Sequence, residues 1–300
     1  MRLLDPIYVL EIDFLRFLQN LPLFEGELFE SFWLLVTKFG DPKTAFVLYF
    51  PVLYALNASW GVDLLSAACI SEFANGVLKW LMHGDRPYWY VFEHNGLNVT
   101  HPLKQLHATC ETGPGSPSGH VMVTATTLVV VLWHARSKCK RKWTIFVCAL
   151  ILVSISRLYI VAHFPHQVLF GVGAGAFVGY FCLKVRFTKE SLLGIATVLS
   201  LLGIGTYKAL TAFGFDPDWS IHLAKKHCEH PEWIHIGTMP LTTLTRDIGA
   251  LFGSFLSKLF TEGKNSSENA AIAVLFLTVA IPRIFNWFRQ ADENLKDKTI

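Results

Sequence analysis

Charged side chains are scarce in this sequence, at 16% of its 300 residues, whereas hydrophobic residues make up 52%. A soluble domain usually carries about a quarter charged residues. The charges that are present gather in short polar segments between long apolar runs, not along amphipathic helices or alternating strands. This pattern excludes an ordinary soluble domain and predicts an all-α, multi-span transmembrane helical bundle.

Other absences exclude further classes of protein. The net charge is only +3, and no basic stripe accompanies it, so we expect no nucleic-acid partner. The six cysteines form no CxxC pair and no zinc spacing, and no cluster of carboxylates offers a metal site. We therefore expect neither a metal nor a cofactor. Residues 1–25 lack the uninterrupted apolar core of a signal peptide and predict a short amphipathic helix at the membrane surface.

The apolar runs give the expected number of spans, because about eight of them approach the ~20 residues that cross a hydrocarbon core. They lie at 44–57, 62–82, 118–134, 143–162, 166–185, 191–213, 244–260 and 270–288. The first could be extended by 31–38, and the first and seventh are the least distinct. We expect a single integral-membrane domain over residues 1–300.

Basic loops predict the orientation of these spans, since Lys and Arg are enriched on the cytosolic side. Five basic residues lie between 136 and 142, and three between 184 and 189. The loops 84–117 and 215–240, and the N-terminus, then face the opposite side. The sequon at Asn98 lies in the first of those loops and is a candidate for glycosylation.

Two cysteines, Cys110 and Cys228, fall in those two non-cytosolic loops. An oxidising lumen permits a disulfide between them. Sequence cannot supply the geometry that a disulfide requires, so their pairing stays open.

Three polar segments end or open predicted spans on this same non-cytosolic side. They are Lys79–Pro87, Cys110–His120 and Ser156–His163. Ionisable groups within or beside spans are energetically costly and usually functional. Taken singly, a basic residue at a span end is more often a membrane anchor, and a Gly/Pro-rich loop is more often only a turn. Their occurrence together on one face favours a functional site.

Together these segments carry the groups that phosphate chemistry needs. Three of their residues are cations, which suit a dianionic phosphate: Lys79, Arg86 and Arg157. Ser118 and Gly119 open a helix, where backbone N–H groups and the helix dipole can hold another phosphate oxygen. Of the two histidines, His120 and His163, one can attack phosphorus and the other can protonate the departing alkoxide.

These segments also resemble a known superfamily. They read KxxxxxxRP (79–87), PSGH (117–120) and SRxxxxxH (156–163), the three signatures of the type 2 phosphatidic acid phosphatase superfamily. The stretches GDRPYW, CETGPGSPSGH, SRLYIVAHFPHQV and CEHPEWIH closely resemble the glucose-6-phosphatase family. The likeness runs from about residue 41 to 252, with a catalytic core at about 41–190.

The resemblance implies roles for the site residues. His163 would be the nucleophile that becomes phosphohistidine, and His120 the general acid and then the general base. Phosphate would be bound by Lys79, Arg86, Ser118, Gly119 and Arg157. The resemblance also implies about 8–9 spans, a multi-pass location in the endoplasmic reticulum membrane with a luminal active site, and functional coupling to a glucose-6-phosphate transporter.

One position departs from the wider superfamily, which places Asp four residues after the nucleophile. Here that position is Gln167. An amide can still orient the imidazole, although it stabilises imidazolium less than a carboxylate does. The glucose-6-phosphatase family resembles this sequence in having Gln there, so the change favours that branch over lipid phosphatases.

The sequence therefore predicts a glucose-6-phosphatase, hydrolysing glucose 6-phosphate to glucose and phosphate. A lipid phosphate or another sugar phosphate is the alternative substrate. An apolar lateral opening between spans would favour the lipid, and a closed pocket the sugar. A weakly active or inactive family member is a further alternative, and a phosphate-binding transporter is disfavoured because the spans lack paired Gly/Pro breaks.

Overall fold

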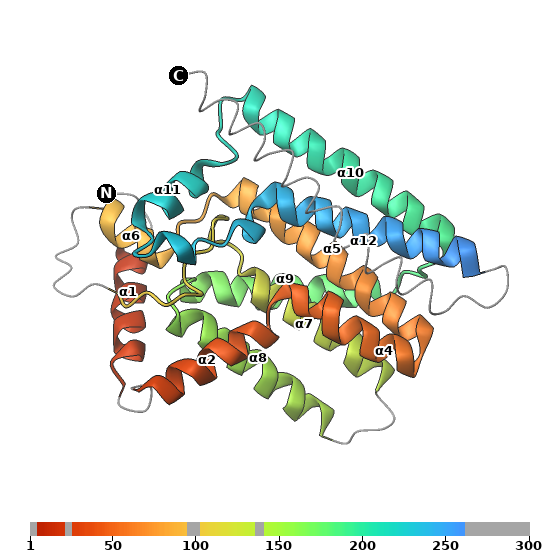
Figure 1. Ribbon diagram of the computed structural model, residues 1–300, viewed down its shortest axis with the longest axis horizontal. Helices are drawn as coiled ribbons and strands as arrows, with labels where there is room; N and C mark the ends of the chain where they lie inside the picture. The colour runs from red at the N-terminus through yellow and green to blue at the C-terminus, as the bar shows by residue number, and fades with distance from the viewer. Residues whose placement is uncertain (1–4, 22–25, 95–102, 136–140, 262–300) are drawn as a thin grey trace.

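The structure is a computed structural model that describes residues 5–21, 26–94, 103–135 and 141–261 (Figure 1). Within these ranges there is no strand, and a single isolated bridge joins Glu111 and His235. The α-helices are α1 (Asp5–Gln19), α2 (Glu27–Phe39), α3 (Pro42–Thr44), α4 (Phe50–Leu56), α5 (Ala58–Met82), α6 (Pro87–Glu93), α7 (Gly119–His134), α8 (Lys142–Tyr159), α9 (Pro165–Cys182), α10 (Lys189–Ala212), α11 (Trp219–His227) and α12 (Pro240–Thr261). A π-helix (Ala45–Tyr49) joins α3 to α4, and two 3-10 turns, Pro231–Trp233 and Ile236–Thr238, follow α11.

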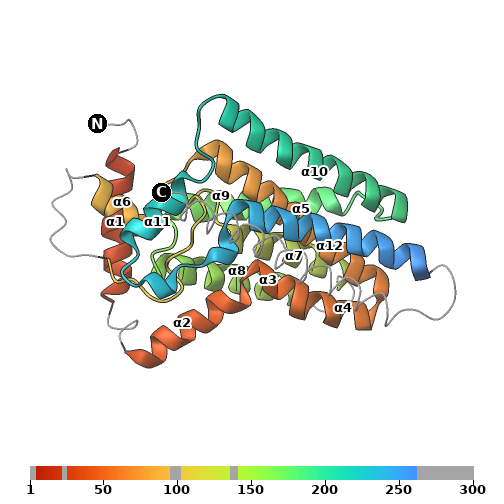
Figure 2. The same cartoon turned by 45° about the horizontal axis from the view of Figure 1, so that its top comes forward.

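The long helices run roughly side by side along the longest axis of the molecule. Both views show α5, α7, α9, α10 and α12 in this bundle, whereas α1, α6 and α11 gather at one end of it (Figures 1 and 2). The loops that precede α7 and α9 lie at this same end. The architecture is therefore the all-α bundle that the apolar runs predicted.

Most expected spans coincide with helices. The runs at 62–82, 118–134, 143–162, 166–185, 191–213 and 244–260 correspond to α5, α7, α8, α9, α10 and α12. The amphipathic helix expected within residues 1–25 is α1. The eighth run, at 270–288, lies outside the described residues.

The first run is divided differently from the expectation. Residues 31–38 do not extend it, because they belong to a separate helix, α2, which ends at Phe39 with Gly40 as its C-cap. The next helix, α3, begins immediately after this cap. Asp41 caps it by accepting a hydrogen bond from the Lys43 N–H, and Pro42 occupies its first turn. The chain changes direction between Phe39 and Pro42 for this local reason.

Among the residues that the structure describes, two stretches are long and apolar enough to cross a membrane, judged by length and composition. They are 58–93, which includes α5 and α6, and 189–212, which is α10. Three further apolar helices are shorter: 42–56, 119–134 and 143–159. Large apolar side chains are exposed along α8, α9 and α10, for example Ile151, Leu169 and Leu201. Such surfaces are typical of helices that face lipid.

Glycines at four-residue spacing bring α9 against α7. A methyl group at Gly175 would lie 2.1 Å from the Met122 carbonyl oxygen, and one at Gly179 would lie 2.9 Å from Val129 Cβ. Small residues at this spacing let two helix backbones approach closely. The contact fixes the start of α7, which carries Ser118 and His120, relative to the start of α9.

We expect Gly175→Ala to destabilise the protein, because the added methyl group meets backbone atoms that cannot move aside. Overpacking of this kind costs about 1–3 kcal/mol. Gly173→Ala is the matched control, since a methyl group there meets nothing within 4 Å. Thermal unfolding in detergent should show a lower Tm for the first variant and an unchanged or higher Tm for the second. Equal Tm values would contradict this account of the α7–α9 contact.

The loops 103–118 and 213–239 meet at the end of the bundle. A disulfide joins Cys110 to Cys228, with their Cα atoms 5.8 Å apart, so the pairing that the sequence left open is present. The Ser220 hydroxyl donates to the Thr112 carbonyl at 2.8 Å, and the His235 N–H donates to the Cys110 carbonyl at 3.0 Å. These contacts place the two loops on the same side, as expected.

Candidate active site

The three motifs meet at the end of the bundle, although the first ends at Pro87 and the last begins only at Ser156. Lys79 lies in the last turn of α5, and Arg86 caps α6. Ser118 caps α7, and Arg157 lies in the last turn of α8. His163 lies in the loop that leads into α9. All the predicted phosphate-binding and catalytic residues are buried: Lys79, Arg86, Ser118, Gly119, His120, Arg157 and His163.

Two glycines allow the first two motif loops to touch. The Gly115 N–H donates to the Gly84 carbonyl at 2.7 Å. A methyl group at Gly84 would lie 2.6 Å from Ser116 Cβ, and one at Gly115 would lie 2.4 Å from the Asp85 carbonyl oxygen. Only glycine fits this approach of backbone to backbone. The contact brings Arg86 beside the segment that carries Glu111.

The Glu111 carboxylate lies at the centre of the cluster. One oxygen, Oε1, is 2.5 Å from Arg157 Nη2 and 3.5 Å from His120 Nδ1. The other, Oε2, is 3.0 Å from Arg86 Nη1 and 3.9 Å from His163 Nε2. One buried carboxylate thus contacts two guanidiniums and faces both histidines, which is the arrangement that an oxyanion such as phosphate would need.

The charge of Glu111 follows from these neighbours. Burial alone would raise the pKa of its carboxyl group, but Arg157 and Arg86 act in the opposite direction and hold the pKa well below its ordinary value. The group is therefore ionised at neutral pH.

Backbone carbonyls hold Arg86 in place. Its Nε donates to the Gly113 carbonyl at 2.7 Å, and its Nη1 donates to the Ala162 carbonyl at 3.0 Å. A third contact, from Nη2 to the Pro114 carbonyl, is 3.3 Å long. Arg86 therefore joins the loops of all three motifs as well as supplying a cation.

Arg157 and Ser118 each have a buried polar atom without a hydrogen-bond partner. Arg157 Nη1 donates to the Thr37 hydroxyl at 2.7 Å, while its Nε is buried without a partner among the described residues. The Ser118 hydroxyl is likewise buried and without a partner there. Buried polar groups are normally satisfied, so both atoms are available to a bound anion.

One detail differs from the sequence expectation, which had the backbone N–H of Ser118 facing the phosphate. That N–H donates to the Gln167 carbonyl at 3.1 Å. The packing of α9 on α7 brings this acceptor close. Ser118 therefore offers its hydroxyl to an anion, whereas Gly119, in the first turn of α7, still has an N–H with no acceptor within its own helix.

His163 is oriented for attack by its Nε2 atom. Its Nδ1 lies 2.7 Å from the Gly115 carbonyl, which can only accept, so Nδ1 carries the proton. The lone pair on Nε2 then faces Arg86 and Glu111. Burial lowers the pKa of the imidazole well below its ordinary value, and Arg86 lowers it further. His163 is therefore neutral, and nucleophilic, at pH 7.

Gln167 contacts the same ring nitrogen of His163, Nδ1, on the side of the imidazole away from Glu111. Its Oε1 lies 3.4 Å from His163 Nδ1 and accepts from the Phe164 N–H at 3.1 Å, and its Nε2 donates to the Asp85 carbonyl at 2.7 Å. The expected contact with His163 exists, but the Gly115 carbonyl is the nearer acceptor. Sequence reasoning missed Gly115, because a carbonyl partner leaves no signal in residue type.

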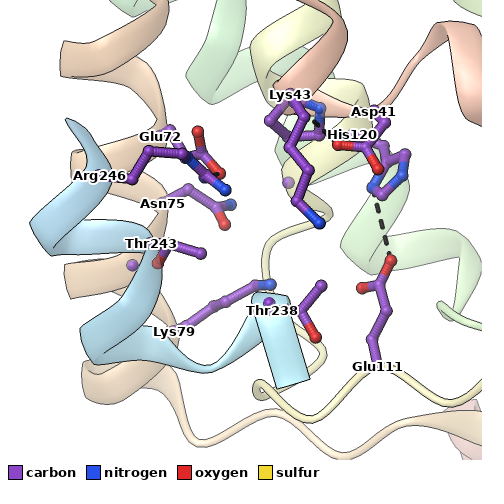
Figure 3. A pocket seen from close by; sticks show the side chains of 14 residues that line it. Asp41, Lys43, Glu72, Asn75, Lys79, Glu111, His120, Thr238, Thr243 and Arg246 are labelled. Carbon is purple, nitrogen blue, oxygen red and sulfur yellow. Dashed lines mark hydrogen bonds and ion pairs between the residues drawn. The ribbon is translucent and has the colours of Figure 1, made fainter. Parts of the chain in front are cut away.

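His120 lies on the other side of Glu111 from His163, at the edge of two adjoining cavities. Both cavities are lined by five shared residues: Asp41, Lys43, Glu111, His120 and Thr238 (Figure 3). A group bound between the two histidines could thus exchange a proton with His120 on the cavity side. Within the described ranges, no group of three or more His, Cys, Asp or Glu could hold a metal ion. Asn98, the candidate glycosylation site, lies outside the described residues.

Comparisons with known proteins agree with the motifs. Residues 60–191 match the model of the PAP2 superfamily. The chain is 40% identical over 239 residues to glucose-6-phosphatase 3 of Bos taurus, covering 75% of this chain and 69% of that protein. It is 36% identical over 244 residues to glucose-6-phosphatase catalytic subunit 1 of Felis catus, covering 75% and 68%. No solved structure matches.

Proposed function

Because this chain belongs to the glucose-6-phosphatase family, and is thus a phosphoric monoester hydrolase, we propose that it hydrolyses glucose 6-phosphate to glucose and inorganic phosphate. The observation that carries the proposal is the buried cluster in which Arg86 and Arg157 flank an oxyanion position that both His163 and His120 face. A phosphate group in that position has a nucleophile on one side and a proton donor on the other.

The first step is transfer of the phosphoryl group to the enzyme. Lys79, Arg86, Arg157, the Ser118 hydroxyl and the Gly119 N–H bind the phosphate oxygens and neutralise their charge. The Nε2 lone pair of His163 forms a bond to phosphorus as the bond from phosphorus to the sugar oxygen breaks. His120 gives its proton to that oxygen, so glucose leaves as an alcohol and a phosphohistidine remains.

The second step returns the enzyme to its first state. His120, now neutral, removes a proton from a water molecule that attacks phosphorus. The phosphorus–nitrogen bond breaks, inorganic phosphate leaves, and His163 regains its lone pair. Gly115 and Gln167 keep the imidazole in the same orientation throughout, because its Nδ1 proton is never transferred.

The chain is further proposed to be one multi-pass domain of the endoplasmic reticulum membrane, with about 8–9 spans, a catalytic core at about 41–190 and a luminal active site. The exposed apolar faces of α8, α9 and α10 and the two long apolar stretches support membrane insertion. The disulfide at the site end of the bundle supports a luminal position. A transporter for glucose 6-phosphate would then supply the substrate.

The polar cavities favour a sugar phosphate over the alternative, a lipid phosphate. The residues around His120 include Asp41, Glu72 and Lys43, which suit hydroxyl groups and would leave acyl chains without apolar contacts. An apolar cavity does exist between Val36, Leu53 and Leu128, but no motif residue lines it. The weakly active or inactive alternative is tested by the activity measurement.

Phosphate release from glucose 6-phosphate by detergent-opened microsomes expressing this chain tests the proposal. A panel with a lysophosphatidate and with mannose 6-phosphate compares the alternative substrates. Release above that of untransfected microsomes is expected for glucose 6-phosphate. Hydrolysis of the lipid alone, or no hydrolysis by folded protein, would overturn the proposed substrate.

His120→Ala is expected to reduce kcat/KM for glucose 6-phosphate by about 10²–10⁴-fold, the usual contribution of a positioned acid or base. This ratio reports phosphoryl transfer from the ester and not the later attack of water, which is the same for every ester. The loss should be smaller for p-nitrophenyl phosphate than for glucose 6-phosphate, since nitrophenolate leaves without a proton. This difference between the two esters separates the loss of a proton donor from general damage to the fold. Equal losses for the two esters would contradict the role of His120 as general acid.

A further inference from the structure

The cavity beside the phosphate cluster has a polar far wall that the hydrolytic steps do not use. Glu111 and His120 line the side next to the cluster. Figure 3 shows Glu72, Asn75, Thr243 and Arg246 on the opposite side, from α5 and α12. His120, which protonates the leaving oxygen, lines both adjoining cavities, but only this one also includes Lys79 and Gly119, which bind the phosphate, so we place the alcohol part of the substrate here.

One face of α5 joins the cluster to this wall. Glu72, Asn75 and Lys79 are spaced by three and four residues, so they lie on the same side of the helix. The rise of the helix places Asn75 roughly 6 Å and Glu72 roughly 10 Å from Lys79 along its axis. A ligand whose phosphate is bound by Lys79 therefore extends past Asn75 toward Glu72.

Glu72 is buried, at 6% exposed, and only one of its carboxylate oxygens is paired. Oε1 forms an ion pair with Arg246 Nη2, whereas Oε2 is buried without a partner among the described residues. Arg246 is shared with Asp247, whose Oδ1 lies 3.6 Å from Arg246 Nε. Asp247 also lies against the Glu72 carboxylate, and both of its oxygens are likewise buried without a hydrogen-bond partner among the described residues. Of these unpaired acceptors, that of Glu72 belongs to a residue that lines the cavity.

Asn75 presents a second acceptor on the same face. Its Nδ2 donates to the Pro117 carbonyl at 3.0 Å, which fixes the orientation of the amide. Its Oδ1 therefore points away from Pro117 and lies beside Gly119, where an added methyl group would be 3.0 Å from it. Asn75 thus lines the cavity and is also hydrogen-bonded to the loop that precedes α7, which carries the proposed phosphate-binding residue Ser118.

We propose that Glu72 and Asn75 form the subsite that accepts hydrogen bonds from the hydroxyl groups of the substrate's sugar. The inference rests on the proposed function and adds to it the residues that select a polyhydroxylated alcohol. A hydroxyl group donates to a carboxylate or amide oxygen, so a sugar satisfies both acceptors. An alcohol without hydroxyls leaves them buried and unpaired, which is the arrangement that discriminates most strongly between substrates.

The first test uses the wild-type protein and glucose 6-phosphates that lack one ring hydroxyl each. At least one deoxy analogue is expected to show kcat/KM lowered by about 10–100-fold, the loss that follows when a hydrogen bond to a charged group is removed. If every deoxy analogue is hydrolysed as fast as glucose 6-phosphate, the subsite does not exist. If glucose 6-phosphate is not hydrolysed but p-nitrophenyl phosphate is, the proposed function fails instead.

The second test assigns the loss to Glu72. Glu72→Gln and Glu72→Asp are compared by the ratio of kcat/KM for glucose 6-phosphate to that for p-nitrophenyl phosphate, and Glu72→Asp keeps the charge that pairs with Arg246. The ratio is expected to fall by about 10–100-fold in Glu72→Gln, and the penalty for at least one deoxy analogue should disappear. Glu190→Gln, on the exposed surface of α10, is the matched control. Equal losses for both esters in both variants would make Glu72 structural and overturn the proposal.

Discussion

Replacing His163 by alanine is expected to abolish phosphate release, with a loss of about 10⁴-fold or more. In the proposed mechanism the buried Nε2 atom forms the bond to phosphorus, and alanine leaves no nucleophile in its place. Radiolabelled substrate followed by an alkaline quench should trap a phosphoenzyme in the wild type and none in the variant. The cavity would still bind phosphate, so KM effects do not explain this loss.

The matched control is His166→Ala, three residues further on. His166 is hydrogen-bonded to Glu11 of α1, with its Nδ1 2.6 Å from Glu11 Oε2, and does not line the cavities. This variant should keep the phosphoenzyme. A His163→Ala protein that retained full activity, or a labelled phosphoenzyme, would exclude His163 as the nucleophile.

Replacing Glu111 by alanine should destabilise the protein by about 3–5 kcal/mol, because Arg86 and Arg157 would be left buried without their counter-ion. Thermal unfolding in detergent measures the change. Glu30→Ala is the matched control, since its ion pair with Lys104 is partly exposed and contributes little. An unchanged Tm for the Glu111 variant would contradict the central position of this carboxylate.

Inorganic phosphate should restore part of the lost stability. A nucleophile must lie about 3–3.5 Å from the atom it attacks, and Glu111 Oε2 is 3.9 Å from His163 Nε2, so the carboxylate and a bound phosphate compete for the same space. Phosphate should therefore raise the Tm of Glu111→Ala more than that of the wild type. Equal shifts would show that the two anions occupy different places.

The effect of Glu111 should also depend on pH, with a definite sign. Its pKa in the folded protein is lowered, so the stability that it contributes is present above the pKa of the unfolded state, about 4.3. That contribution is lost as the pH falls through the lower, folded-state pKa. The difference in Tm between wild type and Glu111→Ala should accordingly shrink in acid.

The sequence predicted the helices of the bundle well, because each apolar run has its own length and ends at its own Gly, Pro or charged residues. It also predicted which residues come together at the end of the bundle, since their spacing within each motif is local. The central position of Glu111 could not be predicted, although the residue lies in a recognisable stretch. Its contacts with Arg86 and Arg157 depend on how three loops pack, and residue spacing carries no information on this.

Contacts between distant segments were missed for the same reason. Thr37, in α2, binds Arg157 across 120 positions of sequence, and Arg246 meets Glu72 across 174. Arg246 also forms an ion pair with its sequence neighbour Asp247, but nothing local in the sequence indicates the contact with Glu72. Such pairs follow from the packing of whole helices, which only the three-dimensional structure supplies.

The bond between Cys110 and Cys228 also bears on what happens to a molecule inserted in the wrong orientation. Cys110 directly precedes Glu111, so the bond anchors the loop that carries the central carboxylate. In an inverted chain both thiols would face the glutathione of the cytosol, which keeps such pairs reduced. The loop would lose its anchor and the cations their counter-ion. On the proposed topology, a protein inserted in the inverted orientation is therefore inactive and does not hydrolyse the sugar phosphates of the cytosol.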